Sequence, residues 1–160
     1  MKNSVAKYFC LIGSFIFWLF LALFSSKLIV DNVTSGHHYS NAVFSLTYLK
    51  NSGAAFSLLE NAREFFIIVA VAFTTLLFVY VHNNKSIHLF SVSFIALLSA
   101  GIMANCHERI VLGYVRDYIH LNFINFPVFN VADVFIMVGV IALIVDISAK
   151  EYLMVCSLAK

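Results

Sequence analysis

Residues 105–133, NCHERIVLGYVRDYIHLNFINFPVFNVAD, form a polar segment in a chain that is 62% hydrophobic and only 11% charged. After Asp133, only twelve apolar or glycine positions follow before Asp146. A helix of that length covers about 18 Å, whereas the hydrocarbon core of a bilayer is about 30 Å thick. A spanning helix must therefore begin near residue 128, which places Asn130 and Asp133 within or beside the membrane boundary. An ionisable side chain there costs free energy and indicates a functional site.

Asp117 is the second aspartate of this segment. Two carboxyl groups brought together at low dielectric cannot both ionise at low cost, so they share a proton, as an aspartic hydrolase requires. Helix capping is the simpler interpretation of Asn130 or Asp133, because either side chain can bind free amide groups at a helix start. Capping leaves Asp117 unexplained, so we expect the two aspartates to meet.

The composition places the chain among membrane proteins. Its 160 residues have the length of one domain, and 62% hydrophobic content with 17 phenylalanines is too apolar for a soluble domain. The formal charge of +2 comes without any run of basic residues, so nothing indicates binding to nucleic acid. Three distant cysteines predict no disulfide framework.

Four apolar runs are long enough to cross a bilayer. We expect transmembrane helices at about residues 8–30, 65–82, 88–104 and 128–148. The first run follows Lys2 and Lys7, as in a secretory signal, but it exceeds the usual apolar core of a signal peptide and lacks a small-residue cleavage site. We interpret it as an uncleaved helix.

Two polar insertions, residues 31–64 and 105–127, connect these helices. Apolar and polar side chains alternate over residues 44–48, which predicts a strand, and a turn signal follows at residues 51–53. A turn of interfacial helix is expected at residues 58–63, and residues 110–126 contain strand-like or interfacial segments. The predicted fold is a single mainly α membrane domain of four transmembrane helices with a small β-containing extracytoplasmic subdomain.

Four spanning helices put both termini on one side of the membrane. Lysine and arginine divide five and five between the two sides, so the positive-inside rule is silent on raw counts. The terminal-side segments are shorter and carry fewer acids, so their charge density favours cytoplasmic termini. Both insertions, and the aspartates beside them, would then lie at the outer leaflet of the cytoplasmic (inner) membrane.

Three ordered motifs cover much of the chain: N-x-G-A-A-F-S at residues 51–57, G-N-x-x-D-R-x-x-x-G-x-V-x-D-[FY] at 104–118, and F-N-x-A-D at 129–133. In these motifs the chain resembles the lipoprotein signal peptidase (signal peptidase II) family, membrane aspartic endopeptidases of bacteria. The resemblance implies that Asp117 and Asp133 are the catalytic pair. The residues that would bind substrate or support the pair are Asn51, Gly53, Asn105, Glu108, Arg109, Asn130 and Lys27. Lys27 has the alternative of snorkelling to the interface.

The chain departs from the family pattern at three positions. Leu23 stands four residues before Lys27, where the family usually carries an aspartate, and Ala104 replaces the first glycine of the second motif. Glu108 replaces the aspartate of D-R, keeping the charge and adding one methylene, so pairing with Arg109 or another cation is expected. None of these changes touches the proposed pair.

The resemblance implies an endopeptidase that removes the signal peptide from diacylglyceryl-modified bacterial prolipoproteins, cutting before the lipidated cysteine. The expected partners are this precursor and membrane lipids, and we expect a monomer without a cofactor.

A metalloprotease is one alternative. Side chains with ligand atoms are present at Cys106, His107, Glu108, Asp117 and His120, but HExxH is absent and adjacent Cys106 and His107 lack the spacing of a usual zinc site. We therefore expect no metal. A small proton-coupled transporter or structural membrane subunit, with Asp133 as a relay, is the other alternative. Two polar insertions on one side, and no helix broken at mid-membrane, argue against transport.

Overall fold

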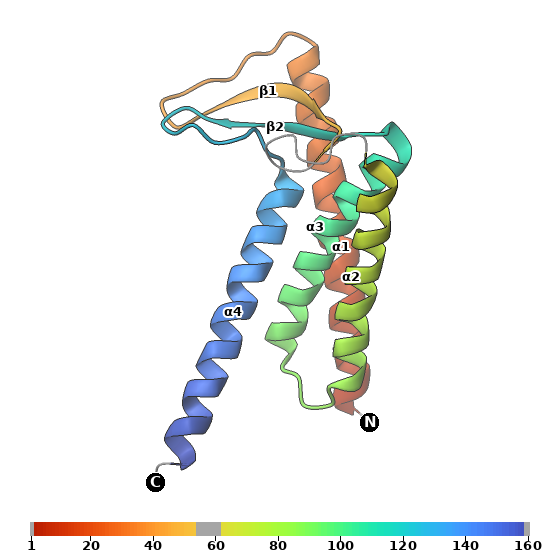
Figure 1. Ribbon diagram of the computed structural model, residues 1–160, viewed down its shortest axis with the longest axis vertical. Coiled ribbons are helices and arrows are strands. Elements are labelled where there is room, and N and C mark those ends of the chain that lie inside the picture. Colours follow the sequence, from red (N-terminus) through yellow and green to blue (C-terminus); the bar gives the residue numbers. More distant parts are fainter. Residues whose placement is uncertain (1, 54–61, 159–160) are drawn as a thin grey trace.

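Four long helices and one antiparallel pair of strands make up the part of the chain that this computed structural model describes, residues 2–53 and 62–158 (Figure 1). In chain order they are α1 (Lys2–Thr34), β1 (Phe44–Asn51), α2 (Arg63–Asn83), α3 (Leu89–Leu112), β2 (Val115–Leu121) and α4 (Val131–Leu158). The strands lie across one end of the helices, and both termini lie at the other end (Figure 1). The predicted fold class, four apolar helices with a small β part, is confirmed.

All four helices are long and apolar enough to cross a membrane. α2, with 21 residues, covers about 32 Å, which matches a hydrocarbon core of about 30 Å. Large apolar side chains such as Phe9, Ile68 and Ile144 are more than half exposed on the outer faces of the helices. In α3 67% of the spanning window is buried, against 17% or less in the other three, so α3 is the central helix.

All four helices differ from their predicted boundaries, and the differences that position the site are the end of α3 and the start of α4. α3 continues to Leu112, past the predicted end at residue 104, and stops at Gly113, whose positive φ of 87° suits glycine. Asn105, Glu108 and Arg109 therefore lie on the last turns of a helix and not in a loop. Arg109 in the last turn is favourable to the helix dipole, and the charge of Glu108 is balanced by Arg116.

α4 begins at Val131, three positions after the predicted start, and continues to Leu158. The backbone before it stays extended because Phe129 exchanges hydrogen bonds with Ile119 of β2, at 3.0 and 2.8 Å. These bonds tie the start of α4 to the strand layer.

β1 and β2 pair in antiparallel register, with Leu49 opposite Asp117 and Asn51 opposite Val115. The strand predicted from residues 44–48 is present, and part of the second insertion is its partner. A register shift between Leu46 and Leu49 marks a bulge, a feature that bends and twists a strand. Residues 58–61 of the predicted interfacial turn and residues 54–57 of the first motif lie outside the described residues, and Arg63, at the end of that turn, is the first residue of α2.

α3 and α4 approach each other closely at small residues. A Cβ atom on Gly101 would lie 2.5 Å from the carbonyl oxygen of Ala132, and one on Gly139 would lie 2.8 Å from the Cβ of Leu98. Beside Gly101, the buried side chains of Ala104 and Ala132 pack against Ala22 of α1. Ala104, which replaces a family glycine, is accommodated in this cluster. The packing sets the separation of the helices that carry Asn105 and Asp133.

We expect Gly101→Ala to destabilise the protein by about 1–3 kcal/mol, because the added methyl group must displace the backbone of α4. Gly13→Ala is the matched control, since a Cβ there meets nothing within 4 Å and alanine favours a helix. Thermal unfolding of both variants in the same detergent measures the difference. A Gly101→Ala melting temperature equal to that of Gly13→Ala would contradict the close contact.

Candidate active site

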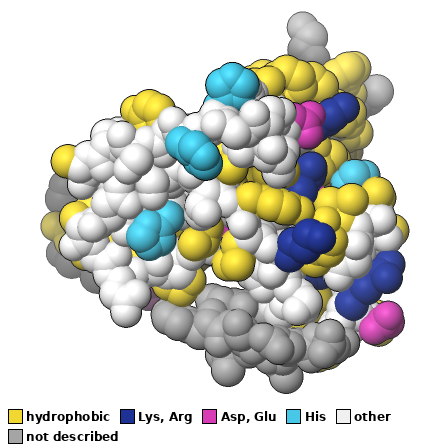
Figure 2. All heavy atoms as spheres, turned by 90° about the horizontal axis from the view of Figure 1, so that it is seen from above, with side chains coloured by type: hydrophobic (Ala, Val, Ile, Leu, Met, Phe, Trp, Pro, Cys, Tyr) yellow, Lys and Arg dark blue, Asp and Glu magenta, His cyan; other side chains and the backbone are white. Residues whose placement is uncertain are grey.

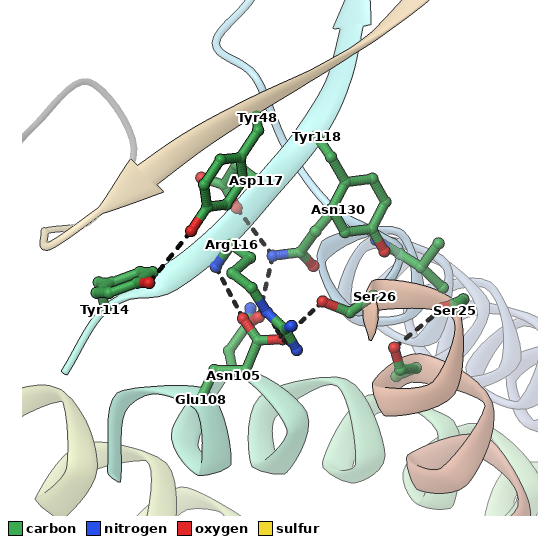
Figure 3. A network of polar contacts seen from close by, with 12 residues as sticks. Ser25, Ser26, Tyr48, Asn105, Glu108, Tyr114, Arg116, Asp117, Tyr118 and Asn130 are labelled. Carbon is green, nitrogen blue, oxygen red and sulfur yellow. Dashed lines mark hydrogen bonds and ion pairs between the residues drawn. The ribbon is translucent and has the colours of Figure 1, made fainter. Parts of the chain in front are cut away.

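Asp117 lies in β2 with only 2% of its surface exposed. Its carboxylate accepts two side-chain hydrogen bonds, from Asn51 Nδ2 to Oδ2 at 2.8 Å and from Asn130 Nδ2 to Oδ1 at 2.9 Å. Figure 3 shows the Asn130 amide directed at this carboxylate. Burial raises the pKa of Asp117 to about 6, and Asp133 adds to the rise, although the bonds from both asparagines oppose it. Asp117 therefore titrates nearer to neutral pH than an exposed aspartate does.

Asp133 lies in the first turn of α4 and is partly exposed. Its Oδ1 accepts a hydrogen bond of 2.7 Å from Asn105 Nδ2, and its Oδ2 accepts one of 3.0 Å from the backbone N–H of Asn130. The backbone N–H of Asp133 donates in return to Asn130 Oδ1 at 3.0 Å. This reciprocal pair is a capping box, so the capping interpretation is confirmed for both residues. Capping leaves Asp133 Oδ1 directed at Asn105.

Asn130 connects the two carboxyl groups. Its Nδ2 donates to Asp117 and also to Asn105 Oδ1, at 3.1 Å, while its backbone binds Asp133. Amide side chains thus link one aspartate on a strand to another on a helix in a single network. Every polar contact in it is a donor facing an acceptor, which lowers the cost of burying the carboxyl groups.

Arg109 lies at the edge of this network. Its Nη2 donates to the carbonyl oxygen of Gly53 at 2.8 Å, and its guanidinium lies 4.8 Å from the centre of the Phe66 ring. Its positive charge lowers the pKa of Asp117, against the effect of burial. Gly53 donates its own N–H to Asn51 Oδ1 at 3.0 Å, which orients the Asn51 amide towards Asp117. The turn at residues 51–53 therefore belongs to the site.

Glu108 contacts neither aspartate directly but binds Arg116, the residue before Asp117. It is buried and pairs with Arg116 at 2.7 Å, and not with its neighbour Arg109. Ser26 of α1 donates to the same carboxylate at 2.6 Å. None of the three motifs specifies Ser26 or Arg116. In the sequence, the only signals for them are a serine beside Lys27 and an arginine beside Asp117.

The structure does not bring Lys27 to the carboxyl groups. Its side chain is exposed and, among the described residues, has no hydrogen-bond or ion-pair partner. Cys106 is buried while adjacent His107 is exposed, so the two face different surroundings. Within residues 2–53 and 62–158, no three His, Cys, Asp or Glu side chains lie together as metal ligands.

An open groove of about 210 Å³ begins beside the network and runs between α2, α3 and α4. Its polar end contains Asn105 and Arg109, and the rest of its lining is Phe66, Val69, Ala70, Phe73, Ile102, Cys106 and Ile136. Such a surface suits an apolar chain attached to a polar group.

Residues 14–149 match the family described as Signal peptidase (SPase) II. A lipoprotein signal peptidase of Streptococcus thermophilus is 43% identical over 109 residues, which cover 68% of this chain and 71% of that protein. One from Streptococcus pyogenes serotype M5 is 37% identical, with 68% and 72% covered. A bacterial membrane enzyme solved by the in meso method at 2.3 Å is similar with a TM-score of 0.77 and 26% identity, covering 88% of this chain and 90% of that one.

The raised pKa of Asp117 predicts a pH-dependent stability. Its protonated form is favoured in the folded state, so this stabilisation is complete below about pH 4 and is lost as the pH rises through about 6. We expect the unfolding free energy of wild type, measured against that of Asp117→Asn, to fall by about 2–3 kcal/mol between pH 4 and 7. Chemical denaturation at several pH values measures it, and a constant difference would refute a buried carboxyl.

Proposed function

The chain belongs to the lipoprotein signal peptidase (signal peptidase II) family, and we propose that it cleaves lipid-modified precursors by an aspartic mechanism. Family membership makes it a multi-pass membrane peptidase of lipoprotein processing, in place of the transporter or structural subunit. The observation that carries the aspartic mechanism is the amide network linking Asp117 to Asp133 through Asn130 and Asn105.

In the proposed mechanism one aspartate is ionised and the other protonated. The ionised carboxylate takes a proton from a water molecule, whose oxygen attacks the carbonyl carbon of the scissile peptide bond. The protonated carboxyl hydrogen-bonds the carbonyl oxygen and then gives its proton to the departing nitrogen as the C–N bond breaks. The pair titrates as a unit, and either aspartate fits either part. Both catalytic carboxyl groups come from one chain, so the proposed mechanism uses no cofactor, no metal and no second copy.

The substrate of this proposal is a prolipoprotein whose cysteine already carries a diacylglyceryl group, cut just before that cysteine. The apolar groove between α2, α3 and α4 supports this substrate. Its acyl chains can pack against Phe73 and Ile136 while the peptide lies at Asn105. Arg109, at the same polar end, is suited to hold a carbonyl group of the peptide.

We further propose that the strand end faces outward from the cytoplasmic membrane and that the termini are cytoplasmic. β2, which contains Asp117, and the first turn of α4, which contains Asp133, lie at the end of the helices opposite the termini (Figure 1). Seen from the strand end, Lys and Arg side chains gather along one side and most of the visible His side chains lie towards the other (Figure 2). Such a polar cap is suited to the headgroup region, so Asp133 lies near the outer leaflet, where the acyl chains of the substrate remain in lipid.

Asp117→Asn and Asp133→Asn should each reduce cleavage of a lipid-modified precursor by about 10²–10⁴-fold, since each removes the acid–base function of one carboxyl. Asp146→Asn is the matched control, because this aspartate, also on α4, binds Ser91 and Lys150 instead. Turnover by purified enzyme in vesicles measures the effect. Near-normal turnover by either Asp117→Asn or Asp133→Asn, with correct folding and insertion, would rule out the aspartic mechanism.

Filling the groove should weaken binding of the lipidated substrate. Ala70→Phe places a ring in the groove, and we expect KM to rise about tenfold through lost burial of the acyl chains. Ala72→Phe, on an exposed face of α2, is the control. An unchanged KM for Ala70→Phe would place the acyl chains elsewhere.

A further inference from the structure

Glu108 lies outside the network that links Asp117 and Asp133, the proposed catalytic dyad, and its carboxylate accepts four hydrogen bonds. Its Oε1 accepts hydrogen bonds from Ser26 Oγ at 2.6 Å and from Arg116 Nε and Nη2 at 3.0 and 2.7 Å. Its Oε2 accepts the backbone N–H of Arg116 at 2.7 Å. Figure 3 shows this carboxylate between α1, α3 and the start of β2. A residue only 4% exposed thus connects three elements.

The two residues that flank Asp117 are each fixed through their backbone. The N–H of Arg116 binds Glu108 on α3, and the N–H of Tyr118 binds the carbonyl oxygen of Phe129, just before α4, at 3.0 Å. Asp117 therefore lies between a contact to α3 and a contact to the start of α4. Pairing with β1 alone would leave a two-stranded sheet free to tilt against the helices.

Successive side chains of a strand point to opposite faces. Because Glu108 holds both the backbone and the guanidinium of Arg116, it fixes the rotation of β2 about its own axis. That rotation decides the direction in which Asp117 projects, towards Asn51 and Asn130. The Arg116 charge balances the buried carboxylate, so the contact adds no unpaired anion beside the dyad.

We propose that Glu108 is a positioning residue for the peptidase reaction: with Ser26 and Arg116 it holds β2 so that Asp117 meets Asp133 in reactive geometry. This inference rests on the proposed aspartic mechanism. Glu108 does not contact the substrate in this role, and its effect reaches the reaction through Arg116 and Asp117.

Glu108→Gln is the first test, because the amide keeps the size of the side chain and loses its charge. We expect kcat for a lipid-modified precursor to fall about 10- to 100-fold, as a displacement near 1 Å does, while KM stays within twofold. Glu64→Gln, an exposed glutamate in the first turn of α2, is the control and should keep both constants. The full-length protein is assayed in vesicles, and rates are normalised to folded enzyme.

Ser26→Ala covers the case in which Glu108→Gln fails to fold, since it removes only one of the four bonds to the carboxylate. We expect it to lower kcat severalfold at unchanged KM. A lower melting temperature with unchanged kcat in the folded variants would overturn the inference, because it would leave only a structural role. A raised KM with unchanged kcat would overturn it too, in favour of substrate binding.

Asp117→Asn, assayed in parallel, distinguishes failure of the aspartic mechanism from failure of the positioning role of Glu108. An active Asp117→Asn would refute the dyad itself. An inactive Asp117→Asn together with full kcat in Glu108→Gln would refute only the positioning role.

Discussion

The structure depends on one amide side chain, that of Asn130, which faces two elements at once. It caps the first turn of α4, which contains Asp133, and it donates to the carboxylate of Asp117 on β2. A strand and a helix meet here because each needs a partner for a buried polar group, and an unsatisfied group would cost about 1–3 kcal/mol. The hydrogen bonds that join β2 to α4 are therefore also the ones that hold the two candidate catalytic carboxyl groups.

The membrane restricts which elements can form this site. Hydrocarbon leaves no water to satisfy a free backbone group, so only helices cross it, and the two strands lie at their end. Small residues then let α3 and α4 approach until Asn105 reaches Asp133, with Gly101 one turn before Asn105. Burial raises the pKa of Asp117, which brings its titration closer to neutral pH.

The departures from the family pattern have a common location. Leu23, Ala104 and Glu108 line one small cavity of about 10 Å³, together with Asn105 and Asn130 of the amide network. Leu23 therefore adds an apolar wall beside Glu108 and brings no second carboxylate to this cavity. Glu108 reaches α1 at Ser26, one turn after Leu23, so a single carboxylate links the first helix to the strand.

The sequence by itself determined the membrane class, the four spans and the strand at residues 44–48, because length, hydrophobicity and alternation are local properties of the chain. The motifs also indicated Asp117, Asp133 and their asparagines. Tertiary structure alone decided that α3 continues through residues 105–112, that Glu108 pairs with Arg116, and that Lys27 stays exposed. Each of these outcomes depends on which distant group satisfies a buried charge, and spacing along the chain does not contain that information.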